Sequence, residues 1–315
     1  MRNKLYDARI MPSKSYNFPV VCVGNLSTGG TGKTPMIEYL IRFLKNDFKV
    51  ATLSRGYGRK TRGFILSNES VTAEDIGDEP FQFYNKFKNE VAIAVDADRQ
   101  NGIAKLHDLV APDVILLDDA FQHRKVAAGF NILLTDFNKL YSKDVVLPTG
   151  NLREPKAGAK RASVIVVTKC PENLSETEKQ AVVKSLNPLT HQQVFFSKIR
   201  YANEVYANDS RVDLEAFLKQ RFILVTGIAN PKPLVNYLNT LGADFEHLKF
   251  PDHHGFSKKE VELLAQKDRI LTTEKDYMRL MTEERLKQKL FYLPIQVEFD
   301  RQKDFEDLVL NFIAP

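Results

Sequence analysis

The sequence contains little cysteine and no long apolar run. Its 315 residues include two cysteines, Cys22 and Cys170, which lie far apart and each within or just after an apolar stretch. This placement argues against a disulfide framework and a cysteine-based metal site, and it favours a reducing compartment. No stretch reaches the roughly 20 apolar residues of a membrane-spanning helix, and the N-terminus lacks the apolar core of a secretory signal. We therefore expect a cytoplasmic protein.

The remaining composition is ordinary for a globular protein. Hydrophobic residues make up 43% of the chain and charged residues 27%, with no internal repeat or low-complexity tract, and 315 residues suffice for two domains. The net charge of +5 is too small to indicate nucleic acid, but residues 1–62 hold twelve Lys or Arg against three acids. Such a basic segment suits a phosphorylated substrate, an anionic membrane surface or RNA, and an ordinary solvated surface is the alternative.

Apolar runs alternate with amphipathic stretches and predict a doubly wound α/β domain. Most of the runs are continuous, as expected of parallel strands covered on both faces. The strand candidates are residues 20–23, 50–53, 91–95, 114–117, 131–135 and 164–168, and helical patterns lie at 34–44 and 176–186. Near residue 194 the pattern changes to two strands joined at Ala202-Asn203, and a second α/β alternation follows. We expect a core domain at 1–193, a two-stranded linker at 194–207 and a smaller α/β domain at 208–315, whose last helix can pack back on the core.

A glycine-rich segment behind the first predicted strand has the pattern of a phosphate-binding loop. The window is Ser27-Thr28-Gly29-Gly30-Thr31-Gly32-Lys33-Thr34, with Ser at the usual first glycine. The glycines allow backbone N–H groups to turn toward an anion. Lys33 can reach the β- and γ-phosphates and Thr34 can ligate Mg²⁺, which predicts a P-loop NTPase core. A glycine-rich strand–helix turn without a ligand is the alternative.

A phosphate loop needs a carboxylate at the end of another buried strand to hold Mg²⁺. Asp118 and Asp119 follow the apolar run 114–117 directly, and the sequence leaves open which of them lies nearer the ion. A purely structural pair at the end of a strand is the alternative. The two motifs together predict binding of a nucleoside triphosphate with Mg²⁺.

The base is predicted to be adenine. Guanine-specific relatives carry an [NT]-K-x-D segment after a late strand, and "VVTKCPEN" has Pro171 at the place of the Asp. In "TTEKDY" the Lys lies one position later than the [NT]-K-x-D pattern requires. Neither segment therefore matches the guanine-binding pattern. Partner-switching ATPases carry a second Lys at the start of the loop. This chain has Thr28 at that position, which argues against membership of that class.

The motifs taken together resemble the signature segments of the tetraacyldisaccharide 4′-kinase family. They occur in the family's order between residues 20 and 277: "VGNLSTGGTGKTP", "LSRGYGRK", "GDEPFQF", "LLDDAFQH", "LPTGNLREP", "VVTKCP", "FPDHHGFS" and "TTEKDY". The resemblance implies a kinase of lipid A biosynthesis that uses ATP and Mg²⁺. It implies phosphorylation of the 4′-hydroxyl of a tetraacyl glucosamine disaccharide 1-phosphate, at the inner face of the inner membrane of a Gram-negative bacterium. The implied fold is a P-loop core joined by a two-stranded linker to a smaller α/β domain.

The same resemblance implies roles for individual residues. Asp78 is the implied general base, and His253 or its neighbour His254 is the partner that orients it, with His253 preferred. A polar turn or a zinc site is the alternative for this histidine pair, but the other histidines form no ligand spacing with it. Lys33, Asp118 and Asp119 complete the implied catalytic set.

Further residues are assigned to substrate and metal on the same ground. The implied substrate-binding residues are Ser54, Arg55, Tyr57, Arg59, Glu79, Arg99, Gln122 and His123. Forked guanidinium groups suit phosphate, and a solvated basic loop is the alternative for the arginines. The implied metal contacts are Thr34, Asp118, Asp119 and, as an outer contact, Glu154.

Membrane contact and partners are also implied. Family members usually carry an apolar or amphipathic N-terminal helix, of which Leu5, Tyr6 and Ile10 are a short remnant before Pro12. We expect peripheral contact with an anionic membrane surface, a glycolipid substrate, a monomer and no nucleic acid, because no aromatic platform interleaves the basic residues. A P-loop ATPase switch that controls a protein partner is the alternative function.

Overall fold

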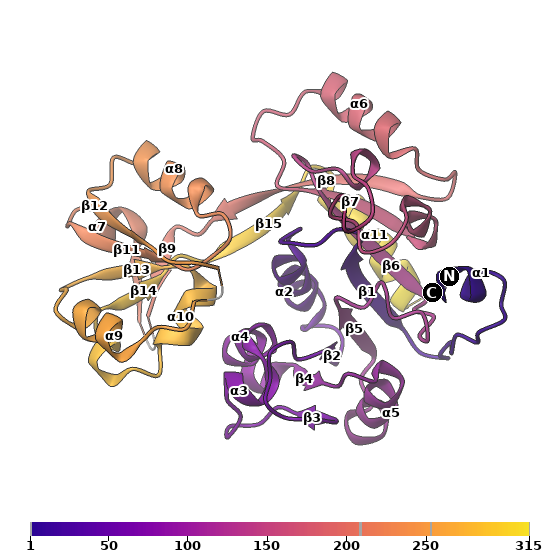
Figure 1. Ribbon diagram of the computed structural model, residues 1–315, viewed down its shortest axis with the longest axis horizontal. Helices are drawn as coiled ribbons and strands as arrows, with labels where there is room; N and C mark the ends of the chain where they lie inside the picture. Colours follow the sequence, from indigo (N-terminus) through magenta and orange to yellow (C-terminus); the bar gives the residue numbers. More distant parts are fainter. Residues whose placement is uncertain (1, 208–209, 253, 315) are drawn as a thin grey trace. The chain divides into compact units, whose positions relative to one another are not determined.

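The computed structural model describes residues 2–207, 210–252 and 254–314 (Figure 1). Within this range the chain divides into two compact units. The first comprises the residues up to Ile199 together with those from Val297 onward, and the second is Arg200–Gln296. The limits expected from the sequence, 1–193, 194–207 and 208–315, stay a prediction beside this division.

The first unit is built on a mostly parallel sheet with the order β15-β8-β7-β6-β1-β5-β2-β4-β3. Its strands are β1 (Val20–Asn25), β2 (Val50–Ser54), β3 (Ile65–Leu66), β4 (Ala92–Val95), β5 (Val114–Asp118), β6 (Phe130–Asp136), β7 (Val164–Thr168), β8 (Gln193–Tyr201) and β15 (Ile295–Phe299). The pairs from β8 to β4 are parallel and β3 is antiparallel to β4. All six predicted core strands are present, and the doubly wound fold class is confirmed. The short edge strand β3 was not predicted, because two residues carry too little pattern.

Helices cover both faces of this sheet (Figure 1). The helices of the first unit are α1 (Arg2–Asp7), α2 (Lys33–Leu44), α3 (Ala73–Ile76), α4 (Asp78–Phe87), α5 (Arg99–Val110), α6 (Glu176–Leu186) and α11 (Gln302–Ile313). Val21 and Val23 point into a core shared with α2, α4 and α11, whereas Val20 and Cys22 point into a core shared with α5 and α6. Both faces of β1 are therefore buried, which explains its continuous apolar sequence.

The second unit has its own sheet, with the order β10-β9-β14-β13-β11-β12. Its elements are β9 (Glu204–Tyr206), β10 (Arg211–Asp213), α7 (Leu214–Leu218), β11 (Phe222–Thr226), α8 (Lys232–Thr240), β12 (Phe245–Lys249), α9 (Lys258–Ala265), β13 (Ile270–Thr272), α10 (Glu274–Leu280) and β14 (Leu290–Tyr292). Strands β12, β11, β13 and β14 are parallel, and the predicted second α/β alternation is present. Gly242, two residues after the last residue of α8, has a φ of +69°, as is common for a glycine that ends a helix.

The two strands predicted within residues 194–207 are both present, as β8 and β9. These strands belong to different sheets: β8 lies beside β7 and β15, and β9 pairs with β10 and β14. The returning strand β15 pairs beside β8, and sequence periodicity cannot show this because the two strands are about a hundred residues apart in the chain.

The N-terminal helix α1 packs on the loop that follows β5. The Arg124 guanidinium lies 5.3 Å from the centre of the Tyr6 ring and 2.9 Å from Oδ1 of Asp7. Among the described residues, no helix has the length and apolar character needed to cross a membrane.

Candidate functional site

The phosphate-loop sequence forms the connection between β1 and α2. Gly29 and Gly32 adopt φ angles of +99° and +88°, which favour glycine, and Gly32 directly precedes α2. Inside the loop, Nδ2 of Asn25 donates a buried hydrogen bond of 2.6 Å to Oγ1 of Thr31. Lys33 and Thr34 are the first two residues of the helix, so their side chains extend from its N-terminus. The strand–loop–helix context that a phosphate loop requires is therefore present.

The Asp pair lies beside this loop at the carboxyl end of β5. Asp118 is the register partner of Val23 on β1, and its side chain is buried. Oδ2 of Asp118 accepts a hydrogen bond of 3.2 Å from Ser54, while its buried Oδ1 has no hydrogen-bond partner among the described residues. Burial, with the Glu79 and Asp119 carboxylates nearby, raises the pKa of Asp118 to about 7.

Asp119 has the opposite electrostatic environment. Although burial alone would raise its pKa, the Lys33 ammonium and the Arg153 guanidinium hold the pKa of Asp119 below its ordinary value. Nζ of Lys33 lies 3.8 Å from Oδ2, and Arg153 donates to both carboxylate oxygens at 2.9 and 3.1 Å. The two carboxyl groups therefore carry different charge near neutral pH, with Asp119 ionised and Asp118 partly protonated.

Asp78 and Glu79 are the first two residues of helix α4. Oγ1 of Thr34 donates a hydrogen bond of 3.3 Å to Oε1 of Glu79, which joins the first turns of α2 and α4. The preceding Gly77 has a φ of +91°, and a Cβ there would lie 2.8 Å from the carbonyl oxygen of Tyr57. The segment 54–59 therefore packs closely against the start of the helix that carries Asp78.

Gln122 and Glu154 connect the loop after β5 to the phosphate loop. Nε2 of Gln122 donates to the Asn25 carbonyl oxygen at 2.7 Å and to Oε1 of Glu154 at 3.0 Å. Glu154 is buried, and its oxygens also accept from Arg161 at 2.7 Å and Asn3 at 2.9 Å. Both oxygens of Glu154 are thus engaged by protein donors, and its role as an outer metal contact stays a prediction.

Arg153 is a site residue that the sequence reasoning missed. Besides Asp119, it donates to the Ser27 carbonyl oxygen at 3.2 Å and to the Asn25 side chain. The available signal was its position in "NLREP", where only the neighbouring Glu154 was singled out. Because its guanidinium bridges the phosphate loop and Asp119, Arg153 fixes the distance between them.

The remaining predicted substrate residues differ in exposure. Arg99 is buried, donates to the Asp96 carbonyl oxygen at 2.7 Å and has its pKa lowered by burial. Arg59 donates to the Gly63 carbonyl oxygen at 2.6 Å, whereas the Tyr57 side chain is 82% exposed and Arg55 is also exposed. Burial, assisted by Arg99, lowers the pKa of His123. Of the three arginines in this set, Arg99 is buried, Arg59 is half-buried and Arg55 is exposed.

The predicted histidine partner lies partly outside the described residues. His253 is not among them, so its assignment remains a prediction. The neighbouring His254 has Nε2 at 3.1 Å from both carboxylate oxygens of Glu260, and its ring stacks on Phe250 at 4.8 Å. Glu260 also closes the capping box of α9 with Ser257. His254 is therefore fixed to the fold of the second unit.

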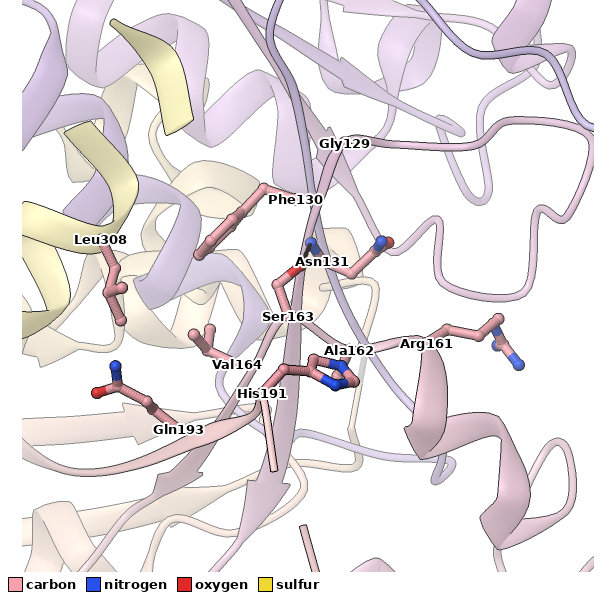
Figure 2. Close-up of a pocket in the computed structure, with 10 residues that line it drawn as sticks. All are labelled: Gly129, Phe130, Asn131, Arg161, Ala162, Ser163, Val164, His191, Gln193 and Leu308. Atoms are coloured by element: carbon pink, nitrogen blue, oxygen red, sulfur yellow. Dashed lines mark hydrogen bonds between the residues drawn. The ribbon is translucent and has the colours of Figure 1, made fainter. Parts of the chain in front are cut away.

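A separate pocket of about 320 Å³ lies at the amino-terminal ends of strands β6, β7 and β8 of the first sheet (Figure 2). It is lined by Phe130 and Asn131 at the start of β6, Val164 at the start of β7 and Gln193 at the start of β8. The Arg161 side chain points away from the other lining residues, toward its bond with Glu154. Because the phosphate loop follows the carboxyl end of β1, this pocket is not part of the site described above.

The donors at the site suit a nucleotide-bound Mg²⁺ ion. In the part of the chain that the structure describes, no cluster of three or more His, Cys, Asp or Glu side chains is arranged to hold a metal unaided. Thr34 and the Asp pair instead offer a few oxygen ligands beside the phosphate loop, and the buried Oδ1 of Asp118 is available to one more donor. Magnesium bound in this way takes its other ligands from phosphates and water.

Comparisons with known proteins agree with this geometry. A family model described as "Tetraacyldisaccharide-1-P 4'-kinase" matches residues 1–314. A tetraacyldisaccharide 4'-kinase of Flavobacterium johnsoniae is 51% identical over 319 residues, which covers 99% of this chain and 92% of the relative. A tetraacyldisaccharide 4'-kinase of Bacteroides fragilis is 42% identical over 335 residues, which covers 99% of this chain and 89% of the relative. A crystal structure of LpxK from Aquifex aeolicus in complex with ATP matches with a TM-score of 0.79. Its sequence is 31% identical, and the match covers 99% of this chain and 94% of that one. The chain therefore belongs to the tetraacyldisaccharide-1-P 4'-kinase family and is a kinase.

Proposed function

We propose that this kinase transfers the γ-phosphate of ATP to the 4′-hydroxyl of a tetraacyl glucosamine disaccharide 1-phosphate in lipid A biosynthesis. The observation that carries the proposal is the juxtaposition, in a chain of this family, of the phosphate loop with the Asp pair. Nζ of Lys33 lies 3.8 Å from Asp119, and Asp118 lies beside the strand that leads into the loop. The ATP complex of the Aquifex aeolicus relative supports ATP as the phosphate donor.

The first unit supplies the groups that position the triphosphate. The backbone N–H groups of residues 27–34 and the N-terminus of α2 bind the phosphates, and Lys33 neutralises charge at the γ-phosphate. Thr34, Asp118 and Asp119 would hold Mg²⁺, which supplies charge neutralisation on the phosphate oxygens when bound. Arg153 keeps Asp119 ionised and at a fixed distance from the loop. The chain's own contribution is therefore mainly positioning and electrostatics.

We propose Asp78 as the general base for the attacking hydroxyl and His253 as its partner. Asp78 is the first residue of α4 and lies next to Glu79, whose side chain bonds to Thr34. The start of α4 is thus tied to the phosphate loop, which places a carboxylate near the triphosphate site. The engagement of His254 by Glu260 and Phe250 supports His253 as the acting histidine of the pair.

We further propose that Ser54, Arg55, Tyr57, Arg59, Arg99, Gln122 and His123 form the glycolipid side of the site, on a monomer that contacts an anionic membrane surface. The excess of Lys and Arg in residues 1–62 supports that contact. Exposed Ile10, and the exposed apolar run Val145, Val146 and Leu147, supply apolar side chains of the kind that enter a bilayer interface. The membrane in question is the inner face of the inner membrane of a Gram-negative bacterium.

The test is transfer of labelled γ-phosphate from ATP, with Mg²⁺, to a tetraacyl disaccharide 1-phosphate in detergent micelles. Reactions with GTP, without acceptor and with EDTA are run beside it. Label on the lipid that depends on ATP and Mg²⁺ is the expected result. ATP hydrolysis without label on the lipid would overturn the proposal and favour a nucleotide-dependent switch.

A further inference from the structure

Two residues adopt the left-handed backbone conformation directly after strands of the first sheet. The non-glycine residues with positive φ among those described are Arg9, Lys88, Ala111, Asp119, Lys169 and Asn187. Lys88, Ala111 and Asn187 end helices, and Arg9 follows α1. Asp119 and Lys169 instead follow β5 and β7, with φ angles of +47° and +57°. Residues other than glycine rarely adopt this conformation, so Asp119 and Lys169 are positions at which a functional role is worth testing.

Lys169 is bonded to the phosphate loop. Its Nζ donates a hydrogen bond to the carbonyl oxygen of Gly30 and lies 2.9 Å from Oδ2 of Asp136. The preceding Thr168 donates from Oγ1 to the carbonyl oxygen of Thr31 at 2.8 Å. Two consecutive residues at the end of β7 therefore hold two consecutive carbonyl groups of the loop. The Lys169 ammonium is fixed, while 40% of its side chain remains exposed to solvent.

The sequence around Lys169 retains half of a base-recognition motif. Guanine-specific P-loop proteins carry [NT]-K-x-D here, and this chain has Thr168 and Lys169 but Pro171 at the place of the Asp. The carboxylate that would read the edge of guanine is missing, whereas the lysine and its contact with the loop remain. A lysine stem does not read base edges, but its methylene groups can pack on the face of any base, with the ammonium adding attraction to the ring.

We propose that Lys169 forms one wall of the subsite for the nucleotide's purine base, with its methylene stem against one face of the ring. This inference rests on the proposed use of ATP. Its ion pair with Asp136 and its hydrogen bond to Gly30 hold the ammonium end of the stem beside the loop before the nucleotide binds. Pre-organising a long side chain in this way reduces the entropy lost on binding. The contact contributes affinity for a base without selecting adenine over guanine.

The experiment compares the binding of Mg·ATP with that of Mg·tripolyphosphate, which has the phosphates but no base. Lys169→Asn removes the stem and retains the backbone, since Asn tolerates the left-handed conformation. Lys169→Met removes the charge but keeps an unbranched stem. Lys139→Ala is the matched control, because Lys139 is an exposed lysine three residues after Asp136. Dissociation constants are measured by isothermal titration calorimetry after each variant's thermal midpoint has been checked.

We expect Lys169→Asn to weaken ATP binding about tenfold and tripolyphosphate binding less than about twofold. Lys169→Met should lose clearly less ATP affinity than Lys169→Asn, and Lys139→Ala should bind both ligands like the wild type. If Lys169→Asn lowers the affinities for ATP and tripolyphosphate equally, Lys169 only anchors the phosphate loop. If it leaves the affinity for ATP unchanged, Lys169 has no role in nucleotide binding. Either result overturns the inference, as does equal weakening by Met and Asn. Failure of the wild-type protein to bind ATP would instead contradict the proposed function.

Discussion

Thr34 and Glu79 are joined by a hydrogen bond of 3.3 Å between a hydroxyl group and a carboxylate oxygen. Thr34 is the second residue of α2 and Glu79 the second residue of α4, so this bond links the N-termini of two helices. Glu79 also raises the pKa of Asp118, second in effect only to burial. The predicted magnesium ligands and the predicted base segment are therefore electrostatically connected within one unit of the protein.

This connection predicts that magnesium-dependent nucleotide binding weakens as the pH falls below neutrality. The pKa of Asp118 is raised to about 7, so its carboxyl group becomes protonated below that pH and must lose a proton to bind a cation. We expect the dissociation constant for Mg·ATP to rise by up to about tenfold between pH 7 and pH 6. Calorimetry in two buffers of different ionisation enthalpy would measure the released proton.

Two variants check this assignment. Glu79→Gln removes a negative charge near Asp118, so the midpoint of the pH dependence should move to lower pH. Asp118→Asn cannot release a proton and should bind with little pH dependence in this range. A wild-type affinity that stays constant from pH 6 to 8 would contradict the raised pKa.

Lys33→Ala should abolish phosphate transfer. Lys33 is the one lysine of the loop motif, and it stands at the N-terminus of α2 beside Asp119. Its loss removes positive charge where the γ-phosphate is expected and also leaves Asp119 with Arg153 as its remaining cation partner in the described contacts. The initial rate with labelled ATP measures the effect, with Lys139→Ala as the control for a lost lysine. Substantial activity in Lys33→Ala would show that the loop binds phosphate without this ammonium group.

Asp78→Ala should lower kcat with little change in ATP affinity. A general base acts in the transition state, so its loss slows the chemical step more than it weakens the binding of nucleotide. His253→Ala should lower kcat in the same direction, and the double variant should be little worse than either single variant if the two residues act together. Steady-state kinetics with varied ATP and varied lipid measure this. A wild-type kcat for Asp78→Ala would contradict the base assignment.

The sequence predicted the parts of this fold that depend on local pattern. The six core strands and the strand–loop–helix at 20–44 follow from apolar runs and from glycines next to Lys33, and both are present. The side-by-side placement of β8 and β15 could not be predicted, because it joins strands about a hundred residues apart in the chain. Arg153 was missed for a related reason. Its contacts with Asp119 and Ser27 connect residues from three different loops, and nothing local marks an arginine for that role.

His254 is expected to affect activity indirectly, by stabilising the loop in which it lies. Its ring stacks on Phe250 and its Nε2 faces Glu260, so His254→Ala removes an aromatic contact and a hydrogen-bond partner together. We expect a lower thermal midpoint and a lower kcat, whereas His254→Phe should recover part of both by restoring the stacking. Thermal unfolding followed by circular dichroism, with kinetics on the same samples, measures the two effects. A His254→Ala variant of wild-type stability but no activity would favour His254 as the acting histidine.

Gly77→Ala should destabilise the start of α4 and reduce activity together. Gly77 has a φ of +91°, and an added Cβ would lie 2.8 Å from the Tyr57 carbonyl oxygen, so the methyl group is disfavoured by conformation and by contact.

Gly63→Ala is the matched control, because Gly63 has a φ of +75° but no neighbouring atom within 4 Å of the added Cβ. We expect Gly63→Ala to cost about 1 kcal/mol in the free energy of unfolding, from backbone strain alone. Gly77→Ala should cost more than this, by about 1–3 kcal/mol from overpacking. Since Asp78 is the next residue, a shift of the helix start should also lower kcat in Gly77→Ala and leave it unchanged in Gly63→Ala. Equal stability and equal kcat in the two variants would show that the contact between Gly77 and Tyr57 does not position the start of α4.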